Sequence, residues 1–468
     1  MNAQVRDVAA FNGIDAVTGL YLPSPSVADI SRTLRGEPPT PVASQLLAKR
    51  NAGAAATLAL PFDVDPRMLD QSGWALLFAH GAQSEIFEGL LALRTLREPQ
   101  AGGRYKVFRD ASGYRQTESV TDWLGRQGAE PGIPQVDKVP YYILIVGGPE
   151  AIPFDFQYEL GVNYAVGRIA FETVEAYRNY AAGVVAGEAV ADGAAPRRAS
   201  FFGVSNDDDR ATTMSRTMLV EPLADALEAR FKQGWQFDRL LDAHATKAGL
   251  AQCLRSSPSL LFTASHGMAF PDGHAKQRVN QGALLCQDWQ GPLQHRGAVG
   301  PELYFAGDDV PDDADLTGSV VFHFACYGAA TPEQDDFGAT GPRAQIAPAA
   351  FVSQLPQRLL GKPGGGALAV IGHVERAWSY SFASPEFGAQ TNTFELCLRT
   401  LMAGLRVGFA MEAFAMRHAQ MAVGLNRVLD DIRHNAAVDD YQVAGLWTAH
   451  HDARNYVILG DPAVRIAH

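Results

Sequence analysis

Two short runs decide the fold: residues 259–267 read SLLFTASHG, and residues 319–328 read SVVFHFACYG. Each is mostly apolar and ends at a glycine-containing turn, which is typical of a strand buried on both faces of a parallel sheet. Ligands bind at the carboxyl ends of the strands in open α/β sheets, so the residues that end these runs are candidates for chemistry. They are His266, followed by Gly267, and Cys326, which begins a Cys-x-Gly turn.

Further apolar runs alternate with amphipathic stretches on both sides of these two strands. We expect strands at residues 141–146, 200–205, 235–241, 367–371 and 456–459, and helices at residues 86–97, 174–186, 221–231, 246–254, 348–360 and 392–417. Strands that alternate with helices form a mostly parallel sheet sandwiched by helices. The sequence therefore predicts the α/β class.

The chain has 468 residues, which is enough for two or three domains. Residues 128–140 (GAEPGIPQVDKVP) have the Pro and Gly density of a linker, and residues 182–196 are rich in Ala and Gly. We predict an N-terminal domain of unassigned role over residues 1–135, a smaller α/β subdomain over residues 136–195, and a catalytic domain over residues 196–468.

Composition and charge exclude several classes of protein. Apolar residues make up 47% of the chain and charged residues 19%, so a folded core is expected. Lys and Arg number 39 and Asp and Glu 51, and the net charge of −12 argues against binding to nucleic acid or to anionic membranes. Neither a signal peptide nor an apolar run of membrane-spanning length is visible. We expect a cytoplasmic protein that needs no cofactor.

Four cysteines are scattered along the chain: Cys253, Cys286, Cys326 and Cys397. None belongs to a CxxC pair, which argues against a zinc ribbon or a disulfide scaffold, and we expect no metal site. Cys253 and Cys397 fall in helical stretches and Cys286 in a short apolar segment, as expected of packing residues. Only Cys326 follows a strand and precedes a glycine turn.

Cys326 and His266 together supply what cysteine nucleophilic catalysis requires. The thiolate attacks a carbonyl carbon, and the imidazole gives a proton to the leaving group. A glycine lets the substrate approach the backbone closely, so the N–H groups of Gly267 and Cys326 are expected to bind the oxyanion. The alternative is a core cysteine and a histidine that caps a turn. Their joint position at two strand ends favours catalysis.

These motifs resemble those of the caspase-like cysteine peptidases, which include caspases, gingipains and CHAT proteases. In caspases the histidine lies about 50 residues before the cysteine, close to the spacing here. The caspase motif is Gln-Ala-Cys-x-Gly, and residues 324–328 read Phe-Ala-Cys-Tyr-Gly. Phe324 in place of Gln points to the gingipain and CHAT branches. Residues 142–153 (YILIVGGPEAIP), 366–378 (GALAVIGHVERAW) and 459–466 (LGDPAVRI) also resemble those branches.

The resemblance covers about residues 136–468 and implies a caspase-like fold and a cysteine endopeptidase. Cys326 would be the nucleophile and His266 the general acid and base, with no third catalytic residue assigned. The resemblance implies a protein or peptide substrate and a bacterial defence or cell-death pathway. Residues 1–135 would then contact an activating partner.

Specificity concerns P1, the residue that precedes the cut bond. Alignment with the caspase helix places Arg216 nearest the basic residue that holds a P1 aspartate, and a guanidinium binds a carboxylate bidentately. The competing feature is the acidic run Asp207-Asp208-Asp209, which would favour Lys or Arg at P1. Either feature could instead be a solvated surface charge. Trp378 resembles the wall of the gingipain S1 pocket, or is a core aromatic residue.

Other readings stay open. His323, three positions before Cys326, should point to the opposite face of its strand as a buried, hydrogen-bonded side chain. The polar loops at residues 307–315 and 329–348 could be cut, gate the cleft or bind an activating ion. Two other functions compete with the peptidase: a catalytically silent scaffold that binds partners through residues 1–135, and a cysteine-dependent acyl transferase or ligase.

Overall fold

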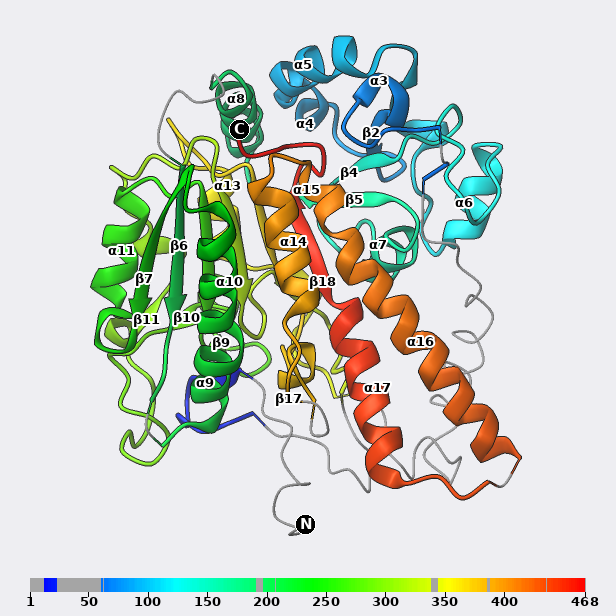
Figure 1. Ribbon diagram of the computed structural model, residues 1–468. Helices are drawn as coiled ribbons and strands as arrows, with labels where there is room; N and C mark the ends of the chain where they lie inside the picture. The colour runs from blue at the N-terminus through cyan, green and yellow to red at the C-terminus, as the bar shows by residue number, and fades with distance from the viewer. Residues whose placement is uncertain are drawn as a thin grey trace.

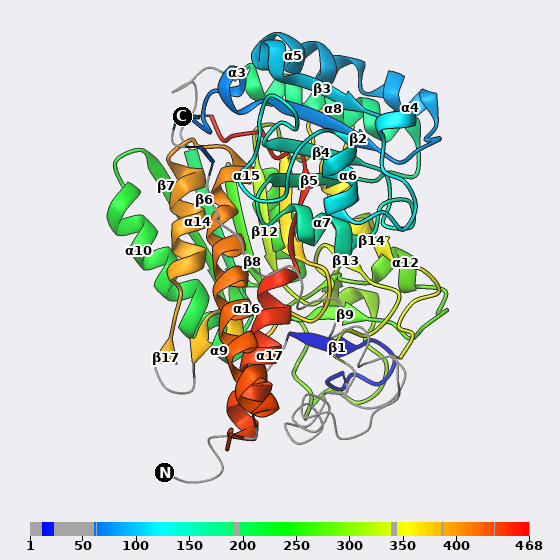
Figure 2. The same ribbon diagram turned by 90° about the vertical axis from the view of Figure 1, so that its right-hand side faces the viewer.

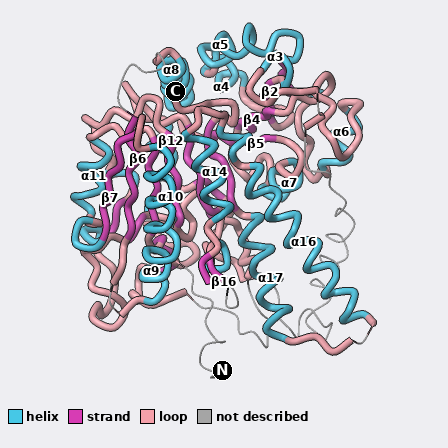
Figure 3. Tube along the Cα trace, in the orientation of Figure 1, coloured by secondary structure: helices cyan, strands magenta, loops and turns pink. Residues whose placement is uncertain are grey.

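The computed structural model describes residues 12–22, 60–61, 63–190, 197–206, 208–337, 344–384, 388–434 and 436–467. Asp207, one of the predicted substrate-binding residues, lies outside the described residues. The centre of the molecule is a ten-stranded sheet between layers of helices (Figures 1 and 3).

The strands of this sheet follow the spatial order β3, β2, β4, β5, β18, β15, β12, β8, β6, β7. Their bounds, in that order, are Tyr105–Phe108, Trp74–Phe78, Tyr142–Val146, Ala165–Ile169, Tyr456–Gly460, Ala369–His373, Val320–Phe324, Leu260–Ala264, Arg197–Gly203 and Trp235–Leu241. Neighbouring strands are parallel except at the junction of β18 with β15. The carboxyl ends of β8, β12 and β15 therefore lie at one edge of the sheet.

The predicted α/β class, with a mostly parallel sheet flanked by helices, is confirmed. The expected strand at residues 235–241 has the bounds of β7, and the other expected strands of the sheet agree within three residues. Buried aliphatic and aromatic side chains fill both faces of the sheet, as the apolar runs predicted.

Helices cover both faces of the sheet. They are α3 (Leu69–Ser72), α4 (Ser84–Gly89), α5 (Leu91–Ala101), α6 (Val120–Arg126), α7 (Phe154–Leu160), α8 (Val174–Glu188), α9 (Arg210–Ser215), α10 (Glu221–Phe231), α11 (Lys247–Arg255), α12 (Gln277–Asn280), α13 (Gln354–Leu360), α14 (Asn392–Met402), α15 (Val407–Ala410), α16 (Glu412–Arg433) and α17 (Asp440–Arg454). In Figure 1, α10, α14 and α16 lie side by side in front of the sheet. The connection from β6 to β7 contains α10, whereas those from β7 to β8 and from β12 to β15, which contain α11 and α13, run across the sheet in the opposite direction. Because such connections are right-handed, α11 and α13 lie on the face opposite α10.

Three predicted helices differ from those observed. The helix expected at residues 86–97 is divided into α4 and α5, because Leu90 leaves the helical conformation at φ −91° and ψ 13°. The stretch at residues 392–417 is interrupted at Gly404, whose φ of +76° suits glycine. The helix expected from residue 348 begins only at Gln354, after the short strand β14 (Phe351–Val352).

The ten-stranded sheet runs across the domain boundaries expected near residues 135 and 195. Trp74 of β2 lies opposite Tyr142 of β4, so strands from both sides of residue 135 pair directly. The last strand, β18, joins the two halves, and Asp461 just after it accepts hydrogen bonds from Trp74 Nε1 at 2.9 Å and Arg97 Nε at 2.7 Å. The terminal motif thus ties the C-terminus to the first half, while the division into domains stays a prediction.

A second, four-stranded sheet brings the N-terminus to the middle of the chain. It contains β1 (Gly13–Asp15), β9 (Gly267–Ala269), β10 (Leu284–Leu285) and β11 (Tyr304–Phe305). β1 pairs in parallel with β9, and Gly13 lies opposite Gly267. Figure 2 shows the two strands side by side at the edge of the large sheet. No helix in the described part of the chain combines the length and apolarity of a membrane span.

Candidate active site

His266 and Cys326 leave the sheet at the same edge. β8 and β12 are neighbours in register, with Ala264 opposite Phe324, so each reactive residue follows its strand by two positions. His266 is 1% exposed and Cys326 is fully buried. The two turns also contact each other, because a Cβ added to Gly267 would lie 1.7 Å from the Cys326 carbonyl oxygen. The sequence-predicted pair is therefore brought together at one place.

A carboxylate that the sequence analysis had not assigned to catalysis contacts the histidine. Oδ2 of Asp209 lies 2.6 Å from Nε2 of His266, and Asp209 is completely buried. Thr212 Oγ1 donates to Oδ2 at 2.7 Å, and the hydroxyl of Tyr21 donates to Oδ1. Burial alone would raise the pKa of Asp209, but His266 and these hydrogen bonds hold it at about 2. Asp209 is therefore an anion that faces the imidazole.

The position of Asp209 follows from its local sequence. Asp209 is the N-cap of α9, and its side chain accepts a hydrogen bond from the backbone of Ala211 at 3.1 Å. The acidic run after β6 was a signal for this role, although its charge alone suggested only substrate specificity. A helix start just after a strand end was the additional sign that the carboxylate faces the catalytic edge.

Of the two imidazole nitrogens of His266, one contacts a carboxylate and the other has no hydrogen-bond partner among the described residues. Nε2 is used by Asp209, whereas the buried Nδ1 has no hydrogen-bond partner within the described residues. The rings of Tyr21 and Trp289 meet the imidazole edge-on, with centroids at 5.5 Å and 5.9 Å. If Nε2 donates its proton to Asp209, then Nδ1 is the atom that exchanges a proton with a substrate.

The two predicted oxyanion donors converge on one oxygen, which belongs to the chain itself. The N–H of Gly267 and the N–H of Cys326 donate to the carbonyl oxygen of Asn12 at 2.8 Å and 3.0 Å. Both distances are those of good N–H···O hydrogen bonds. The next residue, Gly13, lies so close to the nucleophile that an added Cβ would be 2.9 Å from Cys326 Sγ. A peptide group is thus seated where a substrate carbonyl would be expected.

The loop after β15 completes the surroundings of the thiol. The N–H of Ala377 donates to Cys326 Sγ at 3.3 Å, and the carbonyl of Ala377 accepts from the N–H of Asn12 at 3.1 Å. Burial raises the pKa of the Cys326 thiol, and the hydrogen bond from Ala377 and the charge of Arg376 oppose that effect. In this closed arrangement the thiol is therefore protonated at neutral pH.

Arg216, the predicted P1-binding residue, is engaged by two carboxylates. The guanidinium of Arg216 pairs with Glu221 at 2.7 Å and with Asp242 at 3.3 Å. Its neighbour Ser215, by contrast, contacts the side chain of Asn12 through Oγ, at 3.4 Å from Nδ2. The structure therefore places Ser215, and not Arg216, beside the residue that occupies the site.

Trp378 is buried in the cluster that surrounds Cys326, together with Ala269, Tyr327 and Phe337. Its backbone N–H donates to Oδ1 of Asp452 at 2.8 Å. Asp452 also accepts a hydrogen bond from Ser381, so this buried carboxylate holds the loop that carries Trp378. Trp378 packs next to the nucleophile, which is compatible with either of its two predicted roles.

Two other buried histidines of the large sheet, His323 and His373, are held by hydrogen bonds. His323 lies in β12, 2% exposed, with Nδ1 2.8 Å from Thr263 Oγ1, and burial lowers its pKa to about 3. It is thus the buried, hydrogen-bonded side chain that the sequence predicted. His373 is held between the backbone carbonyls of Glu375 and Asp452. Among the described residues, no group of three His, Cys, Asp or Glu side chains could hold a metal ion.

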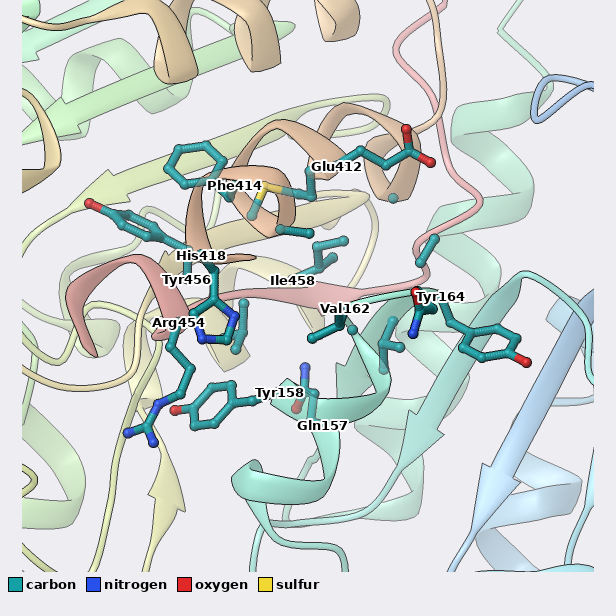
Figure 4. A pocket seen from close by; sticks show the side chains of 18 of the residues that line it. Gln157, Tyr158, Val162, Tyr164, Glu412, Phe414, His418, Arg454, Tyr456 and Ile458 are labelled. Atoms are coloured by element: carbon teal, nitrogen blue, oxygen red, sulfur yellow. The ribbon is translucent and has the colours of Figure 1, made fainter. Parts of the chain in front are cut away.

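A pocket elsewhere in the molecule does not belong to this site. It lies along α7, β18 and α16, and Tyr158, Glu412, His418 and Arg454 are among the residues that line it (Figure 4). Neither His266 nor Cys326 lines it. Burial raises the pKa of Glu412, whose carboxylate accepts a hydrogen bond from Tyr141.

Comparison with known proteins returns remote structural likenesses. No family model and no curated protein matches the chain. The Arg-specific cysteine proteinase gingipain R (RGPB) is 12% identical, with 85% of this chain and 78% of that chain covered and a TM-score of 0.46. A structure described only as a protease is 11% identical, with coverages of 84% and 78% and a TM-score of 0.49. The complex of Porphyromonas gingivalis RgpB pro- and mature domains is 12% identical, with coverages of 84% and 79% and a TM-score of 0.43.

Proposed function

We propose that this chain is a caspase-like cysteine endopeptidase with Cys326 as nucleophile and His266 as general acid and base. The observation that carries the proposal is the pair of N–H groups, from Gly267 and Cys326, that bind one peptide carbonyl oxygen beside the thiol. The Gly267 bond also belongs to the parallel pairing of β1 with β9, whereas the N–H of Cys326 lies outside any strand, so it is the convergence of both on one oxygen beside the thiol that favours catalysis. Two N–H donors aimed at the same oxygen are what acyl transfer requires, because negative charge develops there.

The geometry supports the following reaction. Cys326 Sγ passes its proton to His266 and attacks the carbonyl carbon, and the oxyanion is held by the two N–H groups. The C–N bond breaks, His266 gives the proton to the leaving amine, and a thioester remains. Water, with His266 as general base, then releases the carboxylate and restores the thiol. Asp209 orients the imidazole through its contact with Nε2, so it acts as a positioning residue.

The competing functions predict different products. A silent scaffold would not form a covalent bond with an electrophilic peptide, and an acyl transferase would give an amide in place of a carboxylate. Action in a cytoplasmic defence or cell-death pathway, with a partner that contacts residues 1–135, belongs to the same proposal and rests on the resemblance to CHAT proteases. The acidic P1 preference is not carried forward, because Arg216 is engaged by Glu221 and Asp242.

The test is covalent labelling of the full chain with a peptide that carries a thiol-reactive electrophile, followed by peptide mapping. We expect the label on Cys326, no label in Cys326→Ala, and full labelling in the matched control Cys253→Ala, whose thiol is also buried. Products from a peptide library, incubated with and without an added amine, separate hydrolysis from aminolysis. Absence of any label on Cys326, together with uncut peptides, would contradict the proposal.

A further inference from the structure

The segment at residues 12–22 folds back as a short hairpin over the candidate site. Ile14 bridges to Tyr21, the N–H of Asp15 bonds to the carbonyl of Leu20, and the exposed turn lies between them. Tyr21 reaches Asp209, and Leu22 packs against the cluster around Cys326. This hairpin therefore covers both reactive side chains, which explains why Cys326 and His266 are buried.

The backbone of Asn12 makes the contacts of a substrate at P1. Its carbonyl oxygen occupies the two-donor site of Gly267 and Cys326, and its N–H bonds to the carbonyl of Ala377. Gly13 then follows as the residue after the bond, pressed against the sulfur. A side chain on Gly13 would meet Sγ at 2.9 Å, so glycine is the residue that permits this approach.

The side-chain amide nitrogen of Asn12 faces two hydrogen-bond acceptors. Nδ2 donates to the carbonyl oxygen of Ser265 at 3.1 Å and lies 3.4 Å from Ser215 Oγ. The hydroxyl hydrogen of Ser215 is already given to the carbonyl of Thr212 at 3.0 Å, so Oγ presents a lone pair to Asn12. Asn12 is 1% exposed, and a carboxylate in the same place would face two oxygens without a donor.

We infer that the Asn12–Gly13 bond is a self-cleavage site and that the S1 pocket selects asparagine, an inference that rests on the proposed peptidase function. Cys326 Sγ bonds to the Asn12 carbonyl carbon as the bond to the Gly13 nitrogen breaks, and His266 protonates that nitrogen. Water then converts the thioester to the Asn12 carboxylate and regenerates the thiol. The reaction is a hydrolysis and requires neither an oxidant nor a cofactor.

The chain after the bond is anchored in a sheet. After Gly13 the chain is fixed in the four-stranded sheet: Ile14 is fully buried, and Ala16 exchanges backbone hydrogen bonds with Ala269 and Val299 at 2.7 Å and 2.9 Å. Cleavage therefore leaves the new N-terminus at Gly13 in place. Asn12 is then held only by non-covalent contacts, and its departure would open the asparagine pocket to other substrates.

The experiment follows the intact mass and N-terminal sequence of the purified full chain in reducing buffer over time. We expect a new N-terminus at Gly13 in the wild type and none in Cys326→Ala. Asn12→Asp removes the donor and adds a charge with little change of shape, and should slow the cut about 10- to 100-fold. Val17→Ala alters an exposed residue of the same hairpin and should be cut at the wild-type rate.

Peptide substrates added in trans separate the two hypotheses. With the processed chain, kcat/KM for peptides with Asn at P1 should exceed that for Asp at P1 about tenfold or more. If Cys326 cuts added peptides while Asn12–Gly13 stays intact, self-cleavage is wrong and the peptidase function stands. If neither is cut, both fail. Two other results would overturn the inference. One is cleavage of Asn12–Gly13 in Cys326→Ala at the wild-type rate, which would indicate spontaneous Asn-Gly chemistry. The other is cleavage of Asn12→Asp at the wild-type rate.

Discussion

Replacement of Asp209 with Asn tests whether the buried carboxylate supports catalysis through His266. The charged oxygen lies 2.6 Å from Nε2, and neither group is exposed to solvent by more than 1%. Its pKa falls from the ordinary 3.8 to about 2 although burial opposes ionisation. The interactions that favour the carboxylate therefore outweigh the effect of its burial.

That stabilisation is shared between His266 and the hydrogen bonds from Tyr21 and Thr212, so loss of the charge removes the part that acts on the imidazole. A hydrogen bond to a charged group contributes about 1.5–3 kcal/mol, so we expect kcat/KM to fall about 10- to 150-fold in Asp209→Asn. An Asn still caps α9, because its side-chain oxygen accepts from the backbone of Ala211 in the same way. The melting temperature should consequently change little.

The assay is steady-state cleavage of a peptide, with the fold checked by thermal unfolding. The matched control is Asp208→Asn, which removes a neighbouring carboxylate that accepts from the backbone of Leu293 instead of from the histidine. Its activity should stay within about twofold of the wild type. If Asp209→Asn also retains full activity in a stably folded protein, the carboxylate does not assist His266 and the reasoning is refuted.

Three further changes have defined outcomes. Gly267→Ala would place Cβ 1.7 Å from the Cys326 carbonyl oxygen, so kcat should fall about 100-fold or more, whereas Gly125→Ala, in open space, should leave it unchanged. Burial lowers the pKa of His323 to about 3, so its contribution to the free energy of unfolding is complete above pH 6.5 and is lost as pH falls toward 3. Urea unfolding of the wild type should therefore show a loss of about 2 kcal/mol between pH 7 and pH 5. The His323→Gln variant should not show this loss. Arg216→Ala should leave the P1 preference of a peptide library unchanged and cost less than about 1 kcal/mol in urea unfolding.

The positions that sequence predicted well are those set by local patterns. The run at residues 259–265 had to be a buried strand wherever it lay in the sheet, because nothing polar interrupts its apolar centre. The same holds for the strand before Cys326. Once both were adjacent and parallel, His266 and Cys326 had to emerge at one edge. Helix 221–231 kept its predicted bounds because its apolar spacing and its proline near the start agree.

The positions that sequence missed depend on contacts between distant segments. β1 has three residues, too few for any periodicity, and it forms only because β9 offers it a partner more than 250 residues later in the chain. Asp209 is one of three consecutive acids, and only the approach of His266 and the start of α9 distinguish it from its neighbours. Arg216 was selected by alignment with a remote family, yet its half-buried guanidinium pairs with Glu221, whereas the preceding residue, Ser215, contacts Asn12 in the pocket.

The burial of Cys326 connects the proposed activity with the proposed self-cleavage. A thiol whose pKa is raised by burial is mostly protonated and is a weak nucleophile toward molecules in solution. A tethered peptide compensates for a small thiolate fraction, because its carbonyl is already seated on both N–H donors and beside the sulfur. Release of the segment that ends at Asn12 removes part of the cover that keeps Sγ from water. We therefore expect the internal cut at Asn12–Gly13 to precede cleavage of other chains.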